Sequence, residues 1–512
     1  MYEVRNAPRF IDVAAGGEHS LFLTDRGAVF VCGRSDNGRL GLAFTPSLVN
    51  QLTRFNTIHS STDVTVPVEL PLPPCMKIAA GEYHSALVHA AVHNSPTSSS
   101  YPVRFSTFGS GAVGQLGHGS SVDDVAEPRE VEYFGQLINA RVGGDYASPV
   151  RCAALGDGHS IVILSDASSH AFGNNESGCL GIATAMTSGF SKHSERYGFG
   201  VRGPSRATAS AIGPLAQHRI ASVSTCSRHS LFLTTNGDVF VTGDNAFGQL
   251  GLKGLGKSSI PRRLPLDVSV QQSACGARHS IILCPDGTVR VCGSNKTGEL
   301  GLGRDVQQVD VFTHCPLHHL VSMIAAGAAH SLFVSADRRF VFGCGWGACG
   351  LLGTGLADDV WDPNTFVFST ELTAGDTSGT LHVTSVSCGS HHSLLLLSDG
   401  SVWAAGCNGH GQLGVGGVEA KQFHWRPITM AVAIEVDDRI AAVEESVQRQ
   451  RAAPPPQEGE AFQPRLPSGA DIDVPTSPTS PAPVTGQEAS AQDDDKFVCF
   501  QRSCGSPTPR GE

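Results

Sequence analysis

Residues 220–252 decide the fold and read IASVSTCSRHSLFLTTNGDVFVTGDNAFGQLGL. Within them, residues 230–234 and 238–242 are two short β-rich runs, and Asn236-Gly237 separates them. Asn-Gly between two such runs predicts a hairpin with a type I′ turn, because both central residues of that turn need a positive φ. The stretch therefore begins with a tightly turned pair of antiparallel strands.

The rest of this stretch predicts two more strands around a second turn. Gly243 interrupts the hairpin, and Gly248 and Gly251 bracket a tight turn with Leu250 between them pointing inward. A proline, Pro261, then opens an edge-type strand. Equivalent prolines elsewhere in the chain are Pro67, Pro128 and Pro427. One unit is therefore about four strands in roughly fifty residues.

The same pattern occurs seven times along the chain. The His-Ser pairs that mark the units are His19-Ser20, His84-Ser85, His159-Ser160, His229-Ser230, His279-Ser280, His330-Ser331 and His392-Ser393. A Gly-x-Leu-Gly turn follows each pair, beginning at Gly38, Gly114, Gly178, Gly248, Gly298, Gly350 and Gly411. Four-stranded sheets repeated around an axis make a β-propeller. The predicted fold is an all-β, seven-bladed β-propeller over residues 1–436.

Units longer than the bare repeat carry insertions, expected at residues 43–66, 89–104, 183–202 and 354–381. Insertions in a repeat fold map to loops on its faces, where binding is usually done. The chain starts with a strand near residues 9–15 and offers another at residues 426–432. We expect these N- and C-terminal strands to share one blade and so close the ring.

Composition excludes several classes of function. The net charge is −11 and no block of Lys or Arg occurs, so direct binding of nucleic acid is not expected. No apolar run approaches the ~18 residues of a membrane-spanning helix, and the N-terminus has no apolar segment of a secretory signal. The fifteen cysteines are an odd number, and many sit at repeat positions typical of small buried residues. These features favour a reduced cytoplasmic or nuclear location.

The residues that look chemical are interpreted as structural. His19, His84, His159, His229, His279, His330 and His392 recur one per blade, too far apart to share a metal ion. We expect each to be a neutral, buried imidazole hydrogen-bonded to backbone. The glycine-rich residues 343–347 fall in register with the sixth turn, and a phosphate loop would need a following helix. Cys344/Cys349 and Cys499/Cys504 are C-x4-C pairs without a second pair to complete a zinc site. No catalytic residues, cofactor or metal site are therefore assigned.

The combination of Cys-Gly-x-x-His-Ser, a hairpin and Gly-Gln-Leu-Gly-Leu resembles the regulator-of-chromosome-condensation repeat family over about residues 9–433. The single Trp-Asp pair, Trp361-Asp362, lies in an insertion, which argues against the WD type of propeller. The resemblance implies several functions. The founding member is a nuclear exchange factor for the small GTPase Ran, and other relatives are scaffolds, ciliary GTPase regulators, ubiquitin-ligase appendages and a plant ultraviolet receptor. Fold alone does not choose among them.

Two departures from the Ran exchanger bear on the choice. Its wedge, inserted before the third Gly-x-Leu-Gly turn, has no counterpart in residues 173–178, which are of ordinary length. Its basic N-terminal arm is also missing. We therefore predict a non-enzymatic interaction scaffold that binds protein partners, with a Ran-like small GTPase as the leading class. The alternative is a guanine-nucleotide exchange factor for such a GTPase.

The turns that join the mid-unit glycine to Gly-x-Leu-Gly should line one face of the disc, the face that meets the GTPase in the Ran exchanger. The candidate partner-binding residues in these turns are Asp36, Asn174, Glu176, Asp244, Asn245, Phe247, Asn295, Lys296, Trp346, Asn408 and His410. Asn and Asp also favour tight bends for purely conformational reasons. Phe247 and Trp346 suit either an interface or the core.

The repeat stops near residue 437. Ile440, Val443 and Val447 mark a short amphipathic helix over residues 437–451. Residues 452–512 are rich in Pro and Ser, contain an acidic run at 493–495, and cannot pack a core. We expect this tail to be disordered.

Overall fold

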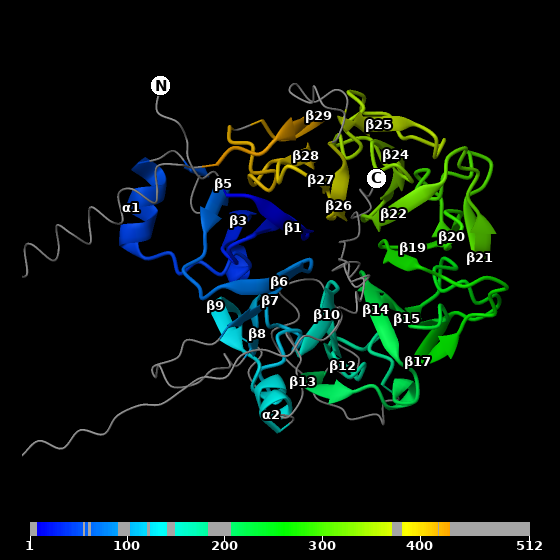
Figure 1. Cartoon of the computed structure of the whole chain (residues 1–512), viewed down its shortest axis with the longest axis horizontal. Helices are drawn as coiled ribbons and strands as arrows, with labels where there is room; N and C mark the ends of the chain where they lie inside the picture. Colours follow the sequence, from blue (N-terminus) through cyan, green and yellow to red (C-terminus); the bar gives the residue numbers. More distant parts are fainter. Residues whose placement is uncertain are drawn as a thin grey trace, which may run out of the picture. The chain divides into compact units, whose positions relative to one another are not determined.

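A computed structural model describes residues 8–54, 57–59, 63–90, 103–119, 123–140, 149–182, 206–370, 381–417 and 419–430. Their strands form seven antiparallel sheets, each built from one contiguous sequence unit. The sheets are arranged around a common centre as the blades of a propeller (Figure 1). The predicted seven-bladed fold is confirmed. The predicted helix at 437–451 and the predicted disordered tail lie outside the described residues.

Strand order within a blade follows chain order from the centre outward. The inner strands are β1 (Phe10–Ala15), β6 (Cys75–Ala80), β10 (Val150–Leu155), β14 (Ile220–Thr225), β18 (Gln272–Cys275), β22 (Val321–Ala326) and β26 (Val383–Cys388). The second strands all begin at the repeat histidine: β2 (His19–Thr24), β7 (His84–Ala90), β11 (His159–Leu164), β15 (His229–Thr234), β19 (His279–Leu283), β23 (His330–Ser335) and β27 (His392–Leu397).

The third strands pair with the second strands, and the fourth strands form the rim. The third strands are β3 (Val29–Gly33), β8 (Val103–Gly109), β12 (Ser169–Gly173), β16 (Val239–Asp244), β20 (Val289–Ser294), β24 (Phe340–Gly345) and β28 (Val402–Cys407). The fourth strands are β5 (Asp63–Glu69), β9 (Val125–Glu130), β13 (Arg206–Ala211), β17 (Lys257–Arg263), β21 (Gln308–His314), β25 (Phe366–Ser369) and β29 (Lys421–Pro427). A two-residue strand, β4 (Ile58–His59), extends the first blade beyond β5.

A glycine at the last or next-to-last position of each third strand fixes the register of that strand. Gly243 pairs with His229, has φ of 114°, and would place a Cβ atom 2.3 Å from the carbonyl oxygen of Arg228. The sixth unit has a glycine at both 343 and 345. Gly345 pairs with His330 and has φ of 117°, so it is the equivalent residue. The glycine-rich residues 343–347 are therefore part of the blade, as predicted.

The shared closing blade is a correction to the sequence prediction. β1 pairs with β2 in the first blade, and β29 pairs with β28 in the seventh. Each unit supplies all four of its own strands, so no terminal strand is left over to complete another blade. The ring closes by side-to-side contact instead: the N–H of Ala15 donates to Ser387 Oγ (2.9 Å), and the N–H of Ser390 donates to the carbonyl of Gly16 (3.2 Å).

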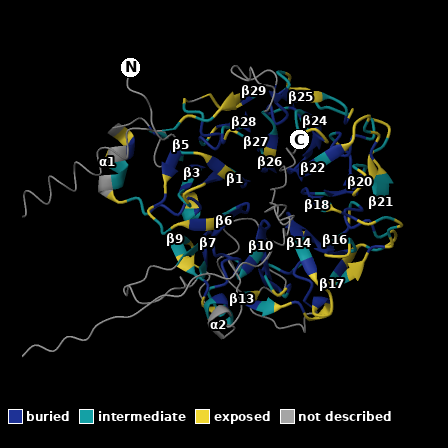
Figure 2. Ribbon diagram, in the orientation of Figure 1, coloured by how far each residue is buried: buried dark blue, intermediate teal, exposed yellow. Residues whose placement is uncertain are grey.

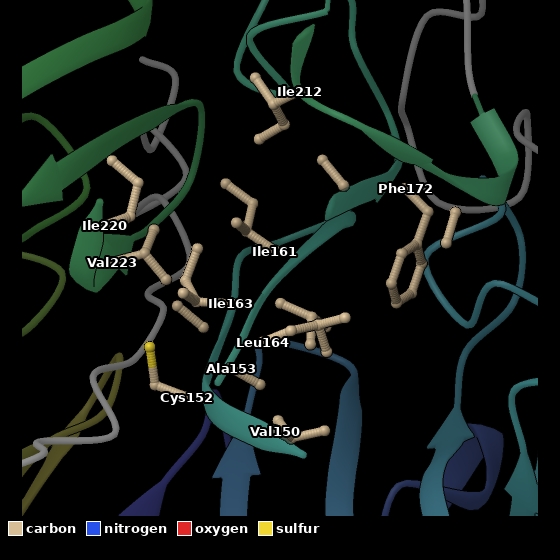
Figure 3. Packing of buried hydrophobic residues seen from close by; sticks show 14 of the residues in the cluster. Val150, Cys152, Ala153, Ile161, Ile163, Leu164, Phe172, Ile212, Ile220 and Val223 are labelled. Carbon is tan, nitrogen blue, oxygen red and sulfur yellow. The ribbon is translucent and has the colours of Figure 1, made fainter. Parts of the chain in front are cut away.

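Apolar residues from adjacent blades pack together in buried clusters, and many of the exposed residues lie toward the rim (Figure 2). One cluster joins Val150, Ile161 and Phe172 of the third blade to Ile220 and Val223 of the fourth (Figure 3). Helix α2 (Glu132–Ala140) adds Phe134 to this cluster, in edge contact with Phe105. The sequence pattern had not predicted a helix at residues 132–140.

The insertions are only partly described. Helix α1 (Pro46–Arg54) and β4 occupy much of the first insertion. Residues 91–102 and 371–380, together with the whole insertion at 183–202, lie outside the described residues. In the fourth insertion, residue Val360 forms an isolated bridge with Gly345. The structure therefore shows an ordered fold for the first insertion and for the start of the fourth.

Candidate functional site: the turn face and its histidine–serine ring

The repeat histidines and serines form a closed circuit from blade to blade. The pairs, with their Nε2–Oγ separations, are His19–Ser85 (2.8 Å), His84–Ser160 (2.8 Å), His159–Ser230 (3.3 Å), His229–Ser280 (2.8 Å), His279–Ser331 (3.1 Å), His330–Ser393 (2.8 Å) and His392–Ser20 (2.9 Å). The last pair joins the seventh blade to the first. Each histidine Nε2 thus has the serine of the next blade as a partner, whereas the sequence predicted a backbone partner; His159 Nε2 also contacts Thr225 Oγ1.

Each serine in turn donates to the Gly-x-Leu-Gly turn of the preceding blade. The acceptors are the carbonyls of the x residues Gln412, Arg39, Gln115, Cys179, Gln249, Glu299 and Leu351, at 2.6–2.9 Å from Ser20, Ser85, Ser160, Ser230, Ser280, Ser331 and Ser393, respectively. A hydroxyl has one proton, so each serine must accept from histidine and Nε2 must be the protonated ring nitrogen. The repeat histidine, the repeat serine and the Gly-x-Leu-Gly turn are thus linked in one hydrogen-bonded joint between neighbouring blades.

This joint requires neutral imidazole. Burial lowers the pKa of His84, His159, His229 and His330 to about 3 each. The glycine three residues before the histidine packs against the ring: a Cβ atom on Gly156 would lie 2.2 Å from His159 Cε1. Among the described residues, no group of three or more His, Cys, Asp or Glu side chains is placed to hold a metal ion.

The Gly-x-x-His loops and the Gly-x-Leu-Gly turns meet on one face of the propeller, which we call the turn face. In every blade the residue after the third-strand glycine donates its N–H to the carbonyl of the residue before the histidine, as Asp244 does to Arg228 (2.9 Å). The hairpin turns, such as Asn236-Gly237, lie at the opposite ends of the same strands. In each blade, the residue before the repeat histidine and the residue after the third-strand glycine therefore lie side by side. The residue types at these two positions vary among the blades.

Three of the predicted partner-binding residues are buried inside their turns. The side-chain oxygens of Asn245, Asn295 and Asn408 accept the N–H of the leucine five residues later, at 2.7, 2.9 and 3.2 Å. Asn175 makes the same bond to Leu180 (3.0 Å), although the sequence analysis named its neighbour Asn174 instead. These bonds lie within the turns, where Asn also favours tight bends for conformational reasons.

The remaining predicted residues reach the surface of the turn face. Asp36 and Lys296 are exposed, whereas Asn174, Glu176, Asp244, Phe247, Trp346 and His410 are half-buried. Asn174 accepts the N–H of Glu176 (2.8 Å), and Asp244 accepts from Gln249 Nε2 (3.0 Å). The structure thus brings these residues to one face but distributes them over several blades.

The sector between the seventh and first blades is an ion-pair network around Glu18. Arg34 Nη1 donates to Glu18 (2.7 Å) and Arg34 Nη2 to Asp36 (2.9 Å), and Asp36 also pairs with the buried Arg39. Burial opposes ionisation of Glu18, but the hydrogen bond and charge of Arg34 hold its pKa below the usual value. His410 lies 2.8 Å from Asp63, and this hydrogen bond raises the pKa of His410.

Two buried carboxyl groups near the ring centre were not identified from the sequence. They occupy the residue directly after the glycine in Gly-x-x-His: Glu82, which accepts from Ser390 Oγ, and Asp157, which accepts from Ser227 Oγ (2.6 Å). Burial and the neighbouring Asp157 raise the pKa of Glu82 to about 8, and burial raises that of Asp157 to about 7. The sequence signal that could have identified these two carboxyl groups is an acidic residue within the Gly-x-x-His motif.

The fourth and fifth blades contribute basic and aromatic groups to the turn face. Arg278 lies over the ring of Phe247 at 4.7 Å from its centroid, and Lys296 lies at 5.4 Å. Arg228 is exposed nearby, directly before the repeat histidine of the fourth blade. In the sixth blade Trp346 makes an edge contact with His391 at 5.8 Å. The turn face is therefore acidic in one sector and basic with aromatic side chains in another.

Two small hollows open on this face. One, of about 320 Å³ including its open mouth, is lined by residues that include Asp157, Asn174, Glu176, Ser227 and Arg228. A second, of about 300 Å³, shares Asp157 and Asn174 and adds Tyr83. Such surfaces suit protrusions of a macromolecular partner better than a deeply enclosed small molecule. No helix among the described residues is long and apolar enough to cross a membrane.

Comparisons with known proteins agree with this architecture. The family model of the RCC1-like domain matches residues 104–448, and models of the regulator of chromosome condensation (RCC1) repeat match residues 10–39 and 26–88. The chain is 24% identical to the ultraviolet-B receptor UVR8 of Arabidopsis thaliana, over 81% of each protein. It is 26% identical to the regulator of chromosome condensation of Mus musculus, over 76% of this chain and 83% of that protein.

Solved structures show the same fold. The crystal structure of human WBSCR16 superposes with a TM-score of 0.62, at 24% identity, over 79% of this chain and 95% of that one. Prp20p of Saccharomyces cerevisiae, whose structure was described with its binding properties to Gsp1p and histones, gives 0.56 at 19% identity, over 85% and 86%. With the family models covering the repeats and the joint between blades explained, the chain belongs to the family of RCC1-like domain proteins.

Proposed function

We propose that this protein is a non-enzymatic regulatory scaffold whose turn face binds a protein partner, with a small GTPase as the leading class. One observation carries the proposal: the repeat gives seven equivalent backbones, while the exposed and half-buried positions beside it differ from blade to blade. Glu18, Tyr83, Arg228 and His391 occupy the same position in different units. Structural positions repeat in this chain, so the non-repeating ones are free to provide specificity.

Charge arrangement indicates what a partner must offer. The sector around Glu18 and Asp36 suits a basic patch, whereas Arg228, Arg278 and Lys296 suit an acidic one. Phe247, whose ring lies near both Arg278 and Lys296, and Trp346 supply aromatic anchors of the kind enriched at interfaces. The partner therefore presents a surface with two charge signs, as a folded protein does.

The alternative function is guanine-nucleotide exchange. Sequence similarity to the regulator of chromosome condensation of Mus musculus supports it. The third turn weighs against it, because Asn175 and Leu180 form the same compact turn there as their equivalents do in other blades. No projecting element precedes Gly178 among the described residues of this turn. We therefore rank binding without exchange first.

A binding experiment with full-length protein tests the proposal. Purified small GTPases, each in the GDP, GTP-analogue and nucleotide-free states, are titrated against wild type and an Arg228→Glu/Lys296→Glu variant. Both residues are exposed, so folding should persist. We expect at least one GTPase to bind and the double variant to weaken it by roughly tenfold or more.

The matched control is Arg26→Glu, since Arg26 is exposed in a hairpin turn at the opposite end of the first blade. Equal loss of binding in this control would remove the turn face from the proposal, and absence of binding across the panel would remove the GTPase. Fluorescent-nucleotide release measured in parallel separates the two functions, because acceleration above the intrinsic rate would place exchange first.

A further inference from the structure

Two cysteines from different blades meet on the turn face. Cys349 lies in the sixth blade's Gly-x-Leu-Gly turn region, directly before Gly350, and Cys407 is the last residue of β28 in the seventh blade. Their thiols lie close enough for each to shift the pKa of the other. Both are unpaired cysteines in this structure.

The backbone around the two cysteines brings them together independently. Cys407 pairs with Lys421 across the β28–β29 ladder, and Lys421 Nζ donates to the carbonyl of Ala348 (3.1 Å), the residue before Cys349. A Cβ atom on Gly350 would lie 2.6 Å from the carbonyl oxygen of Gln422. The turn carrying Cys349 is thus pressed against the strand that pairs with Cys407.

This pair differs from the other described cysteines. Cys407 is half-buried and Cys349 is 8% exposed, whereas each other described cysteine is 5% exposed or less, so this pair is the one that a solute reaches most readily. The hydrogen bond from Cys407 and the charge of Lys421 lower the pKa of Cys349 to about 7, against the effect of burial. By contrast, burial raises the pKa of Cys152 to about 11 and that of Cys179 to about 12. Thiolate is the reactive form of cysteine.

We propose that Cys349 and Cys407 form a thiol–disulfide redox site, which a low-molecular-weight disulfide such as glutathione disulfide oxidises to a covalent link between the sixth and seventh blades. The Cys349 thiolate attacks one sulfur of glutathione disulfide, forms a mixed disulfide and releases one glutathione thiolate. Cys407 then loses its proton and attacks Cys349 Sγ, which forms the Cys349–Cys407 bond and releases the second glutathione thiolate. Two protein thiols are oxidised and one disulfide is reduced to two thiols.

Cys349 is thus the attacking residue and Cys407 the resolving residue. The bond would tie together the two turns that carry Trp346 and His410. Reduction by glutathione reverses it. This chemistry is independent of what the turn face binds.

Mass spectrometry of the full chain tests the site. Fully reduced protein is exposed to millimolar glutathione disulfide, free thiols are blocked, and the digest is analysed without reduction. We expect a peptide pair joined through Cys349 and Cys407. In Cys407→Ser, Cys349 should accumulate as the glutathione mixed disulfide, and in Cys349→Ser, Cys407 should stay reduced.

Two further variants check the chemistry. Lys421→Met should slow modification of Cys349 by roughly threefold to tenfold at neutral pH and little at alkaline pH, where the thiolate forms without help. Cys284→Ser changes a buried cysteine directly after β19 and should leave the Cys349–Cys407 cross-link unchanged. Circular dichroism verifies that each variant folds. The redox site is overturned if wild type gives no cross-link, or if Cys349 reacts no faster than Cys284.

Discussion

At the scale of single residues, the seven His-Ser pairs work as joints between blades rather than as chemical groups. Each serine oxygen serves two blades, because it accepts from the preceding histidine and donates to a turn carbonyl, as Ser280 does with His229 (2.8 Å) and Gln249 (2.7 Å). All three groups are buried, so no water replaces a lost partner. The hydrogen bonds between neighbouring blades therefore explain why a polar His-Ser pair recurs inside the apolar core.

Replacing Ser280 with alanine should destabilise the protein. The His229 N–H and the Gln249 carbonyl would both lose a buried partner, at a cost of about 1–3 kcal/mol each. We expect the free energy of unfolding, measured by urea titration, to fall by about 2–4 kcal/mol. Ser269→Ala changes an exposed serine and serves as the control, with an expected change within about 0.5 kcal/mol. Equal effects of the two substitutions would contradict the joint.

At the scale of the strand and turn, glycines decide where each unit bends. Gly243 and Gly254 belong to the same blade and both have a positive φ, of 114° and 74°. They differ in surroundings: a Cβ atom on Gly243 would lie 2.3 Å from a backbone oxygen, whereas nothing lies within 4 Å of one on Gly254. Comparing these two glycines therefore separates the effect of the positive φ from the effect of the space available to a Cβ atom.

The pair Gly243→Ala and Gly254→Ala measures that difference. Gly254→Ala should cost about 1 kcal/mol, the conformational strain of alanine at positive φ. Gly243→Ala must also displace the Arg228 carbonyl, which is held by a strand hydrogen bond, and should cost more than about 3 kcal/mol. Thermal unfolding followed by circular dichroism distinguishes them. A Gly243→Ala variant as stable as Gly254→Ala would show that the register is not set at this residue.

At the scale of the whole molecule, buried histidines outnumber buried carboxyls in the core of the ring. Burial lowers the pKa of His19, His84, His159, His229, His279 and His330 below the usual value. Burial raises the pKa of Glu82 and Asp157 to about 8 and about 7. The unfolded chain therefore binds more protons than the folded chain once the pH falls below the unfolded histidine value of about 6.5.

The propeller should lose stability as the pH falls from about 6.5 towards 4.5. Each histidine contributes a loss of about 1.4 kcal/mol per pH unit, because its folded pKa is lowered. Glu82 and Asp157 act in the opposite direction over this range, because their folded pKa values are raised and they take up protons in the folded state. Six histidines outweigh two carboxyls.

Urea midpoints measured across this pH range check the sign. Asp157→Asn removes one offsetting carboxyl and should steepen the fall. A midpoint that stays constant or rises as the pH is lowered would contradict the neutral, buried state of the histidines.

Much of this architecture follows from sequence spacing alone. The number of blades, the hairpin at Asn236-Gly237 and the inward-facing repeat residues depend on contacts within about fifty residues, where glycine conformation and β-strand pattern decide locally. The same local logic missed α2, because nine residues with Phe134 as a buried anchor give a short periodic signal. It also named Asn174 where Asn175 holds the turn.

Contacts between units were decided only by the tertiary structure. Ring closure through β1 and β26, the bond from Ser390 to Glu82 across 308 positions, and the meeting of Cys349 with Cys407 join parts of different blades. The spacing of the repeat predicts the strands and turns of a single blade. The angle between blades determines which side chains of neighbouring blades touch. That angle arises from packing around the whole ring, so the partner of each histidine and the charge sectors of the turn face could be assigned only from the folded molecule.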